Sequence, residues 1–187
     1  MQPGSGLVEI CNAKYGFNGW LGIAGIWASG DHITKGYVKV NDSYFSLSTY
    51  NTPEWRQLVM CQEVGHVFGL GHQDEDFNNP NLNTCMDYSN DPESNQHPNQ
   101  HDYDQLAAIY GHLDSFDSWA PAPVDDGSGS GKGNGKGNGK GKKGEAPGLA
   151  ISQWGKAVST DGKGRPDLFE RDLGNGNKAF THVLWAD

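Results

Sequence analysis

Two histidines, a glutamate and a glutamine stand at a spacing that suits metal-assisted hydrolysis. They belong to the run Gln62-Glu63-Val64-Gly65-His66-Val67-Phe68-Gly69-Leu70-Gly71-His72. This run matches the long zinc signature H-E-x-x-H-x-x-G-x-x-H at every fixed position except the first, where glutamine replaces histidine. Because helix residues four apart lie on one face, the side chains at positions 62 and 66 can converge on one ion.

The expected chemistry is that of a metal ion beside a carboxylate. Gly69 ends the helix, and the turn that follows can bring His72 in as a ligand. A metal-bound water has a lowered pKa, and Glu63 can take its proton as the water attacks a carbonyl group. A lone histidine is more often structural than a ligand, but the joint spacing of His66 and His72 with Glu63 favours metal binding.

Position 62 is where the sequence departs from the signature. Glutamine offers zinc a neutral amide oxygen where an imidazole nitrogen is the better match. Gln62 is therefore either a weak ligand or a helix-face side chain that is hydrogen-bonded to its neighbours. Asp74 or Glu75, just after the run, could take its place, and so could His97 or His101 farther along the chain.

The other polar residues near the run have simpler interpretations. The carboxylates of Asp74, Glu75 and Asp76 could bind calcium, but we favour a solvated surface for each of them. Five histidines are expected to be ordinary surface residues, namely His32, His97, His101, His112 and His182.

A hairpin and two helices are predicted around the run. Residues 21–27 and 33–40 have strand-like composition and are joined by a polar turn. The motif helix is expected to begin after Thr52 as N-cap, with proline in its first position, and to end at Gly69. A second helix is predicted over residues 102–110, with its apolar side chains in one stripe and a glycine after it.

Composition divides the chain into three parts. Residues 7–124 have the composition of a globular domain, and residues 125–148 are a repeat of glycine and lysine that is typical of a flexible linker. Residues 149–187 are predicted to form a small β-rich module, with strands around 152–158, 167–173 and 179–185. So small a module has little core of its own, so we expect it to dock on another surface.

Charge and composition narrow the classes of partner. Residues 1–124 hold 15 acidic and 4 basic side chains, and the whole chain has a net charge of −9. An acidic domain disfavours nucleic acid, whose phosphates attract a basic surface. No stretch approaches the ~20 apolar residues of a membrane span, and residues 1–6 lack the apolar core of a signal peptide. We expect a secreted monomer whose signal segment is not part of this chain.

Three cysteines leave the redox environment open. If Cys61 and Cys85 pair, the disulfide ties the motif helix to the segment that carries Met86 and stabilises the fold by roughly 3–4 kcal/mol. Cys11 would then be unpaired, or its partner would lie outside this chain. The alternative is three reduced cysteines in a cytosolic protein, which the secreted-type composition disfavours.

Residues 20–112 resemble a bacterial metzincin, in particular the matrixins, in three features beyond the signature. The segment Thr84-Cys85-Met86-Asp87-Tyr88 resembles the Met-turn, in which a methionine lies beneath the metal. Tyr88 matches the tyrosine that some metzincins use as an extra ligand or transition-state donor. Residues 100–111 resemble the helix that follows this turn. The resemblance implies an α+β, zincin-like fold, with a mixed twisted sheet packed on the active-site helix and a β appendage.

The resemblance also implies an activity, which is zinc-dependent cleavage of peptide bonds in a peptide or protein substrate. Glu63 would be the general base and Tyr88 a second catalytic group, with one zinc ion held by Gln62, His66 and His72. In metzincins an edge strand above the metal binds the substrate in extended form by main-chain hydrogen bonds. That role would fall here to four residues, Gly22, Ile23, Ala24 and Gly25. The alternative for this segment is an ordinary edge strand.

Two other functions remain open at this point. Gln62 favours a pseudoprotease, in which the same fold binds peptides or proteins without cleaving them. A third possibility is that the C-terminal module is the functional binding unit and the metzincin-like part is a scaffold.

Overall fold

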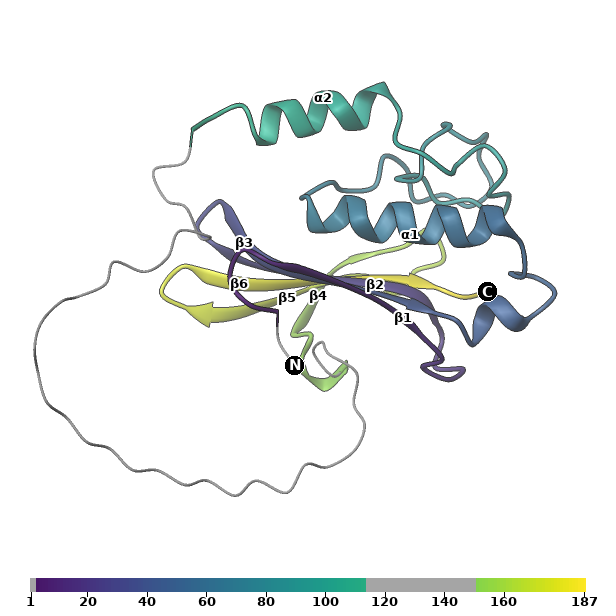
Figure 1. Ribbon diagram of the computed structural model, residues 1–187, viewed down its shortest axis with the longest axis horizontal. Helices are drawn as coiled ribbons and strands as arrows, with labels where there is room; N and C mark the ends of the chain where they lie inside the picture. Colours follow the sequence, from purple (N-terminus) through teal and green to yellow (C-terminus); the bar gives the residue numbers. More distant parts are fainter. Residues whose placement is uncertain (1–2, 114–150) are drawn as a thin grey trace, which may run out of the picture.

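Six strands form one mixed sheet in the spatial order β1-β3-β2-β6-β5-β4 (Figure 1). The computed structural model describes residues 3–113 and 151–187. β1 runs parallel to β3, and every other pair of neighbours is antiparallel. The strands are β1 (Val8–Ala13), β2 (Trp20–Ser29), β3 (His32–Asn41), β4 (Lys156–Thr160), β5 (Pro166–Gly174) and β6 (Asn177–Trp185).

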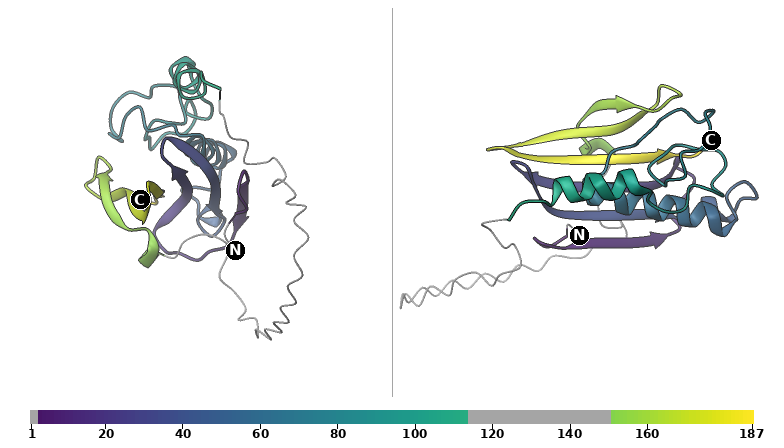
Figure 2. Two further views of the ribbon diagram at one scale, coloured as in Figure 1. Left: turned by 90° about the vertical axis from the view of Figure 1, so that its left-hand side faces the viewer. Right: turned by 90° about the horizontal axis from the view of Figure 1, so that it is seen from above.

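Two α-helices lie on the same side of this sheet, as both views from the side and from above show (Figures 1 and 2). They are α1 (Pro53–Val67) and α2 (Gln100–Ile109). Two short 3₁₀ helices, Tyr44–Ser46 and Ile151–Gln153, complete the helical structure of the described residues. The α+β class and the mixed sheet packed on a helix are therefore as the sequence predicts.

α1 begins and ends as predicted. The Thr52 side chain accepts a hydrogen bond from the Trp55 N–H, and proline occupies the first helical position, where its missing N–H costs nothing. The helix ends at Val67, with Phe68 as its C-cap. Gly69 follows with a φ of 90°, a left-handed conformation that glycine adopts without strain. This turn directs the chain back towards the helix.

α2 is correctly placed, but its predicted apolar stripe is not the buried face. Tyr103 and Tyr110 are each 54 % exposed, while Asp102 is buried. Asn99 and Asp102 form a capping box, in which each side chain accepts a hydrogen bond from the other residue's backbone N–H. The stripe prediction is wrong because this helix is tied down at its first turn by hydrogen bonds and packs mainly through Leu106.

The strands of residues 149–187 do not form a separate sheet. β6 (yellow in Figure 1) lies between β2 and β5, with Trp185 opposite Trp20 and Asn177 opposite Ser29. β2 is therefore a central strand, and the prediction that residues 22–25 lie at an edge is wrong. By joining the larger sheet, β6 packs Phe180 and Leu184 into the apolar cluster that lies against α1.

Three further differences concern local structure. β1 was not predicted, and it begins as an exposed strand whose pattern is weakly apolar. The first C-terminal strand begins at Lys156 and not near residue 152, because a 3₁₀ turn precedes it. The predicted linker, 125–148, lies outside the described residues. Among the residues that are described, no helix is long and apolar enough to cross a membrane.

Apolar side chains fill both faces of the sheet. The face towards α1 holds a cluster that includes Leu21, Val38 and Leu58. The opposite face holds a second cluster rich in tryptophan, with Trp154 covering Trp20 and Trp27 as part of it. A disulfide between Cys61 and Cys85 joins α1 to the predicted Met-turn, as expected, and Cys11 is unpaired.

Candidate metal centre

The buried end of α1 presents the residues of the signature. Gln62 and Glu63 are 0 % exposed and His66 is 2 % exposed. Met86 lies directly against this helix, since a Cβ atom on Gly65 would stand 2.5 Å from the Met86 sulfur. The methionine thus packs beneath the helix turn that carries His66.

His66 and His72 come together as the spacing predicts. Their ring centroids are 4.6 Å apart and the ring planes are nearly perpendicular. His66 Nδ1 lies 2.8 Å from the carbonyl oxygen of Leu70. A carbonyl only accepts, so Nδ1 carries the proton and Nε2 keeps a lone pair that can bind a metal.

A third imidazole joins them from the C-terminal part of the chain. The ring of His182, on β6, stacks on that of His66 with centroids 3.9 Å and planes 11° apart, and its centroid lies 6.2 Å from that of His72. We call His66, His72 and His182 the histidine cluster. Sequence analysis assigned His182 to the surface, because nothing in its spacing connects it with a motif 110 residues earlier.

Two carboxylates and a tyrosine lie near the ring of His72. Its Nδ1 lies 3.5 Å from Glu75 Oε1 and 3.8 Å from Asp167 Oδ2, distances beyond a normal hydrogen bond. The Tyr88 hydroxyl donates to Asp167 Oδ2 at 3.1 Å, and its ring lies 4.3 Å from that of His72. Asp167, from β5, was not predicted, whereas Glu75 was one of the proposed substitutes.

Several buried polar atoms at this centre lack a partner. Both amide atoms of Gln62, both carboxylate oxygens of Glu63 and the Nδ1 of His182 have no hydrogen-bond partner among the described residues. Buried polar atoms are almost always paired, and an unmet group costs about 1–3 kcal/mol. The alternative interpretation of Gln62, a helix-face residue bonded to its neighbours, is therefore not what the structure has.

Burial dominates the electrostatics of these groups. It raises the pKa of the Glu63 carboxyl well above its usual range. It lowers the pKa of His182 to about 3, with a further contribution from His72, and lowers the pKa of His66 well below its usual value. Burial likewise raises the pKa of Asp167, although the neighbouring His72 opposes that shift.

The predicted peptide-binding segment has another structural role. A Cβ atom on Gly22 would stand 2.5 Å from Glu63 Oε1, and one on Gly25 would collide with the Tyr37 ring. Ala24 lies opposite His182 in the register of β2 and β6. The small residues of β2 thus make room for Glu63 and His182 inside the protein, and the edge beside them is occupied by β6.

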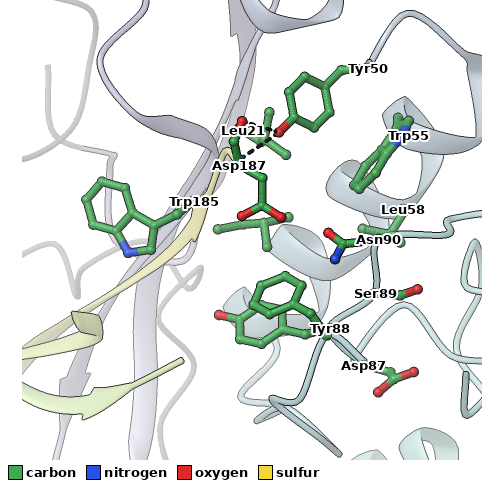
Figure 3. A pocket seen from close by; sticks show the side chains of 12 residues that line it. Leu21, Tyr50, Trp55, Leu58, Asp87, Tyr88, Ser89, Asn90, Trp185 and Asp187 are labelled. Carbon is green, nitrogen blue, oxygen red and sulfur yellow. Dashed lines mark hydrogen bonds between the residues drawn. The ribbon is translucent and has the colours of Figure 1, made fainter. Parts of the chain in front are cut away.

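A small hollow of about 10 Å³, room for about one water molecule, lies next to this centre (Figure 3). Its lining includes Trp55 of α1, Tyr88 at the end of the predicted Met-turn segment, Asn90 just after it, and Asp187. The Tyr50 hydroxyl accepts a hydrogen bond from the Asp187 N–H at 2.6 Å, which fixes the C-terminal side of the hollow. Tyr88 is shared, because it lines the hollow and also contacts His72.

A buried network that the sequence did not reveal holds the segment beneath α1. Asp102 accepts hydrogen bonds from the Thr84 hydroxyl and, at 2.7 Å, from the Gln73 side-chain amide. Thr84 Oγ1 in turn accepts a hydrogen bond from the Met86 N–H. Met86 is thereby positioned from α2. Of the other proposed substitutes for Gln62, Asp74 is half-buried and His97 and His101 are exposed.

Comparisons with known proteins add no family to this description. No protein-family model, curated protein or solved structure matches the chain. The residues themselves fit a zinc ion, which prefers imidazole nitrogens supplemented by carboxylate or other oxygens. The unpaired buried atoms of Gln62 and Glu63, on the same helix as His66, are the specific sign of that fit.

Proposed function

We propose that this chain is a zinc-dependent metalloendopeptidase of the metzincin type. The observation that carries the proposal is the Glu63 carboxylate, buried and unpaired among the described residues, on the same helix turn as His66. His66 and His72 would hold the ion, with the Gln62 amide oxygen as a weaker ligand. A bound Zn²⁺ supplies Lewis-acid chemistry, which polarises a carbonyl group and acidifies water.

The chain's own residues would then divide the remaining work. Glu63 accepts a proton from the attacking water and returns it to the leaving amine. Burial raises the pKa of this carboxyl, which makes it a stronger proton acceptor than a solvated carboxylate. The Leu70 carbonyl keeps His66 in the tautomer whose Nε2 is free. A substrate peptide must approach by a path other than pairing with β2.

Secretion and the class of substrate are part of the same proposal. The Cys61–Cys85 disulfide is typical of an oxidising compartment. The proposed substrate is a peptide or protein, and the proposed enzyme is a monomer. The acidic composition disfavours nucleic acid as a partner.

The experiment compares Glu63→Gln with Glu54→Gln, a change at the start of the same helix. Glu63→Gln should abolish cleavage of an unstructured protein substrate such as casein while zinc content stays unchanged. Glu54→Gln should retain both. Peptidase activity retained by Glu63→Gln, in protein free of other proteases, contradicts the assignment.

A second candidate is a pseudoprotease that binds peptides without cleaving them. Two observations favour it: glutamine at position 62, and β6 in the position beside β2. Metal analysis of protein refolded with added zinc separates the two. About one zinc per chain supports the peptidase, whereas absence of zinc supports the binding protein.

A further inference from the structure

A buried imidazole and a buried carboxylate lie beside a second carboxylate that solvent can reach. The side chains of His72 and Asp167 are 6 % and 1 % exposed, whereas that of Glu75 is 40 % exposed. Asp167 Oδ1 has no hydrogen-bond partner among the described residues. A buried carboxylate oxygen without a partner destabilises a fold, so a cation at this position would stabilise it.

The main chain brings the two carboxylates together from different parts of the fold. Glu75 belongs to the loop after α1, and Asp167 is the second residue of β5. The Gly162 N–H, in the turn between β4 and β5, donates to the Glu75 carbonyl oxygen at 2.9 Å. A Cβ atom on Gly162 would stand 2.3 Å from that oxygen, so the close approach requires glycine. The loop and β5 are thus joined by the backbone itself.

The distances around His72 fit a shared metal ion better than they fit hydrogen bonds. Its Nδ1 lies 3.5 Å from Glu75 Oε1 and 3.8 Å from Asp167 Oδ2, whereas N–H···O hydrogen bonds span about 2.7–3.2 Å. Two ligand atoms of a tetrahedral zinc ion are about 3.3–3.5 Å apart, because each lies about 2.0–2.2 Å from the metal. One ligand atom from each of the three residues lies within 4.8 Å of the others, so small side-chain movements would close the site.

The charges of the same groups favour a divalent cation. Burial raises the pKa of Asp167, and the negative charge of Glu75 adds to that shift, although His72 opposes it. Two carboxylates that repel each other are both stabilised by a cation between them. Calcium takes oxygen ligands only, whereas one imidazole nitrogen with two carboxylates is a donor set that suits zinc.

We propose that His72, Glu75 and Asp167 form a second zinc site, which we call the outer site. Its ligands are His72 Nδ1 and one oxygen from each carboxylate, which leaves a fourth position for water in a tetrahedral site. Tyr88 keeps its hydrogen bond to Asp167 Oδ2, because a carboxylate oxygen has two lone pairs. The outer site goes beyond the proposed function, which uses His72 to hold the catalytic ion.

The outer site and the catalytic ion compete for His72. A neutral imidazole has a free lone pair on one ring nitrogen and carries a proton on the other. An ion on Nδ1 therefore leaves Nε2 protonated, and an ion on Nε2 leaves the proton on Nδ1, facing the carboxylates. Zinc in excess of one ion per chain should thus inhibit the proposed peptidase. That consequence alone rests on the proposed function.

Zinc titration of the full-length chain tests the outer site separately from the catalytic ion. His66→Ala removes a proposed catalytic ligand and leaves the three outer ligands in place, so this variant should still bind about one zinc ion. In that background Glu75→Gln and Asp167→Asn should each weaken binding by ~100-fold or more, beyond the ~10–100-fold typical of residues that only support a ligand. Glu93→Gln, a change at an exposed glutamate, is the matched control and should bind as its parent does.

Cobalt and a cysteine test for a direct bond to position 167. In a His66→Ala, Cys11→Ser background, which lacks the unpaired thiol, Asp167→Cys should show a thiolate-to-cobalt charge-transfer band in the near ultraviolet. The band requires a bond between the sulfur and Co²⁺, so a merely structural role for this position would not produce it. Far-ultraviolet circular dichroism checks that each variant is folded, and His66→Asn replaces His66→Ala if the alanine variant is not.

The outcomes separate the outer site from the proposed function. A folded position-66 variant that binds no zinc, or that binds it equally well after Glu75→Gln and Asp167→Asn, overturns the outer site and leaves the peptidase proposal intact. Binding that depends on both carboxylates, with the cobalt band, supports the outer site even if the wild-type chain cleaves no protein. A wild-type chain that holds zinc but has no peptidase activity overturns the proposed function alone.

Discussion

The imidazole of His182 stacks on that of His66, with ring centroids 3.9 Å apart and planes 11° apart. These residues are 116 positions apart in the sequence, and one lies on the central helix while the other lies on the last strand. Because His66 is buried and His182 is half-buried, protonating either imidazole of this contact is costly, which makes the pair sensitive to pH.

The first prediction concerns pH in protein treated with a chelator. His182 has a pKa of about 3 in the folded chain against an ordinary value of 6.5. Between these values only the unfolded chain takes up the proton, so the stability that neutral His182 contributes falls as pH falls. At about 1.4 kcal/mol per pH unit, wild type should lose roughly 2 kcal/mol relative to His182→Asn between about pH 7 and pH 5.

Urea unfolding at the two pH values measures this difference. Glu63 and Asp167, whose pKa values are raised, contribute with the opposite sign, and His66 contributes with the same sign; all three are present in both proteins. Parallel stability curves for the two proteins would contradict the assignment of His182 as a buried neutral histidine.

The second prediction concerns the close approach of β2 to α1. Gly22→Ala should destabilise the protein by about 1–3 kcal/mol, because the added methyl group would stand 2.5 Å from Glu63 Oε1. It should also reduce peptidase activity by displacing that carboxylate. Gly71→Ala is the matched control, since its Cβ would meet nothing within 4 Å. Chemical denaturation and casein cleavage measure the two effects. A Gly22→Ala protein as stable as Gly71→Ala would show that Glu63 is not held there.

The third prediction concerns the disulfide. Replacing both Cys61 and Cys85 with alanine should lower the free energy of unfolding by about 3–4 kcal/mol, the loop-closure value for a separation of 24 residues. Zinc affinity should fall as well, because the bridge fixes the segment that carries Met86 beneath α1. Cys11→Ser serves as the control and should change neither quantity. Equal stability of the double variant and wild type would mean that the bridge adds nothing.

The fourth prediction concerns the carboxylate beside His72. Asp167→Asn should weaken zinc binding by ~10–100-fold, because the amide can no longer fix the ring of a histidine ligand as a carboxylate does. Asp31→Asn, an exposed change in the turn between β2 and β3, should have no effect. Isothermal titration of zinc into the full-length chain compares them. Asp167→Asn with unaltered affinity would remove Asp167 from the metal centre.

Much of this structure is determined by local sequence and could be predicted. Thr52, Pro53 and Gly69 determine the limits of α1 through capping and backbone conformation, which depend on neighbouring residues alone. The hairpin of β2 and β3 follows from alternation and a polar turn. The convergence of His66 and His72 follows from helix periodicity and one glycine turn.

The errors that concern the site arise where distant segments meet. That β2 is central depends on its pairing with β6, a contact that no local pattern encodes. Nothing in the sequence connects His182 or Asp167 with the signature, because His182 is 116 positions from His66 and Asp167 is 95 positions from His72. Gly22 and Ala24 leave space for Glu63 and His182, groups of the protein itself, and that space could not be traced to them from the sequence.

The position of β6 has a consequence for synthesis of the protein. Ser29 emerges from the ribosome 148 residues before its partner Asn177, which at ~5–20 residues per second is a delay of roughly 7–30 s. During that interval β2 has an unpaired edge, and the nascent chain lacks the imidazole of His182. His66 and His72 are therefore translated long before β6, whose His182 lies against the ring of His66 in the folded protein.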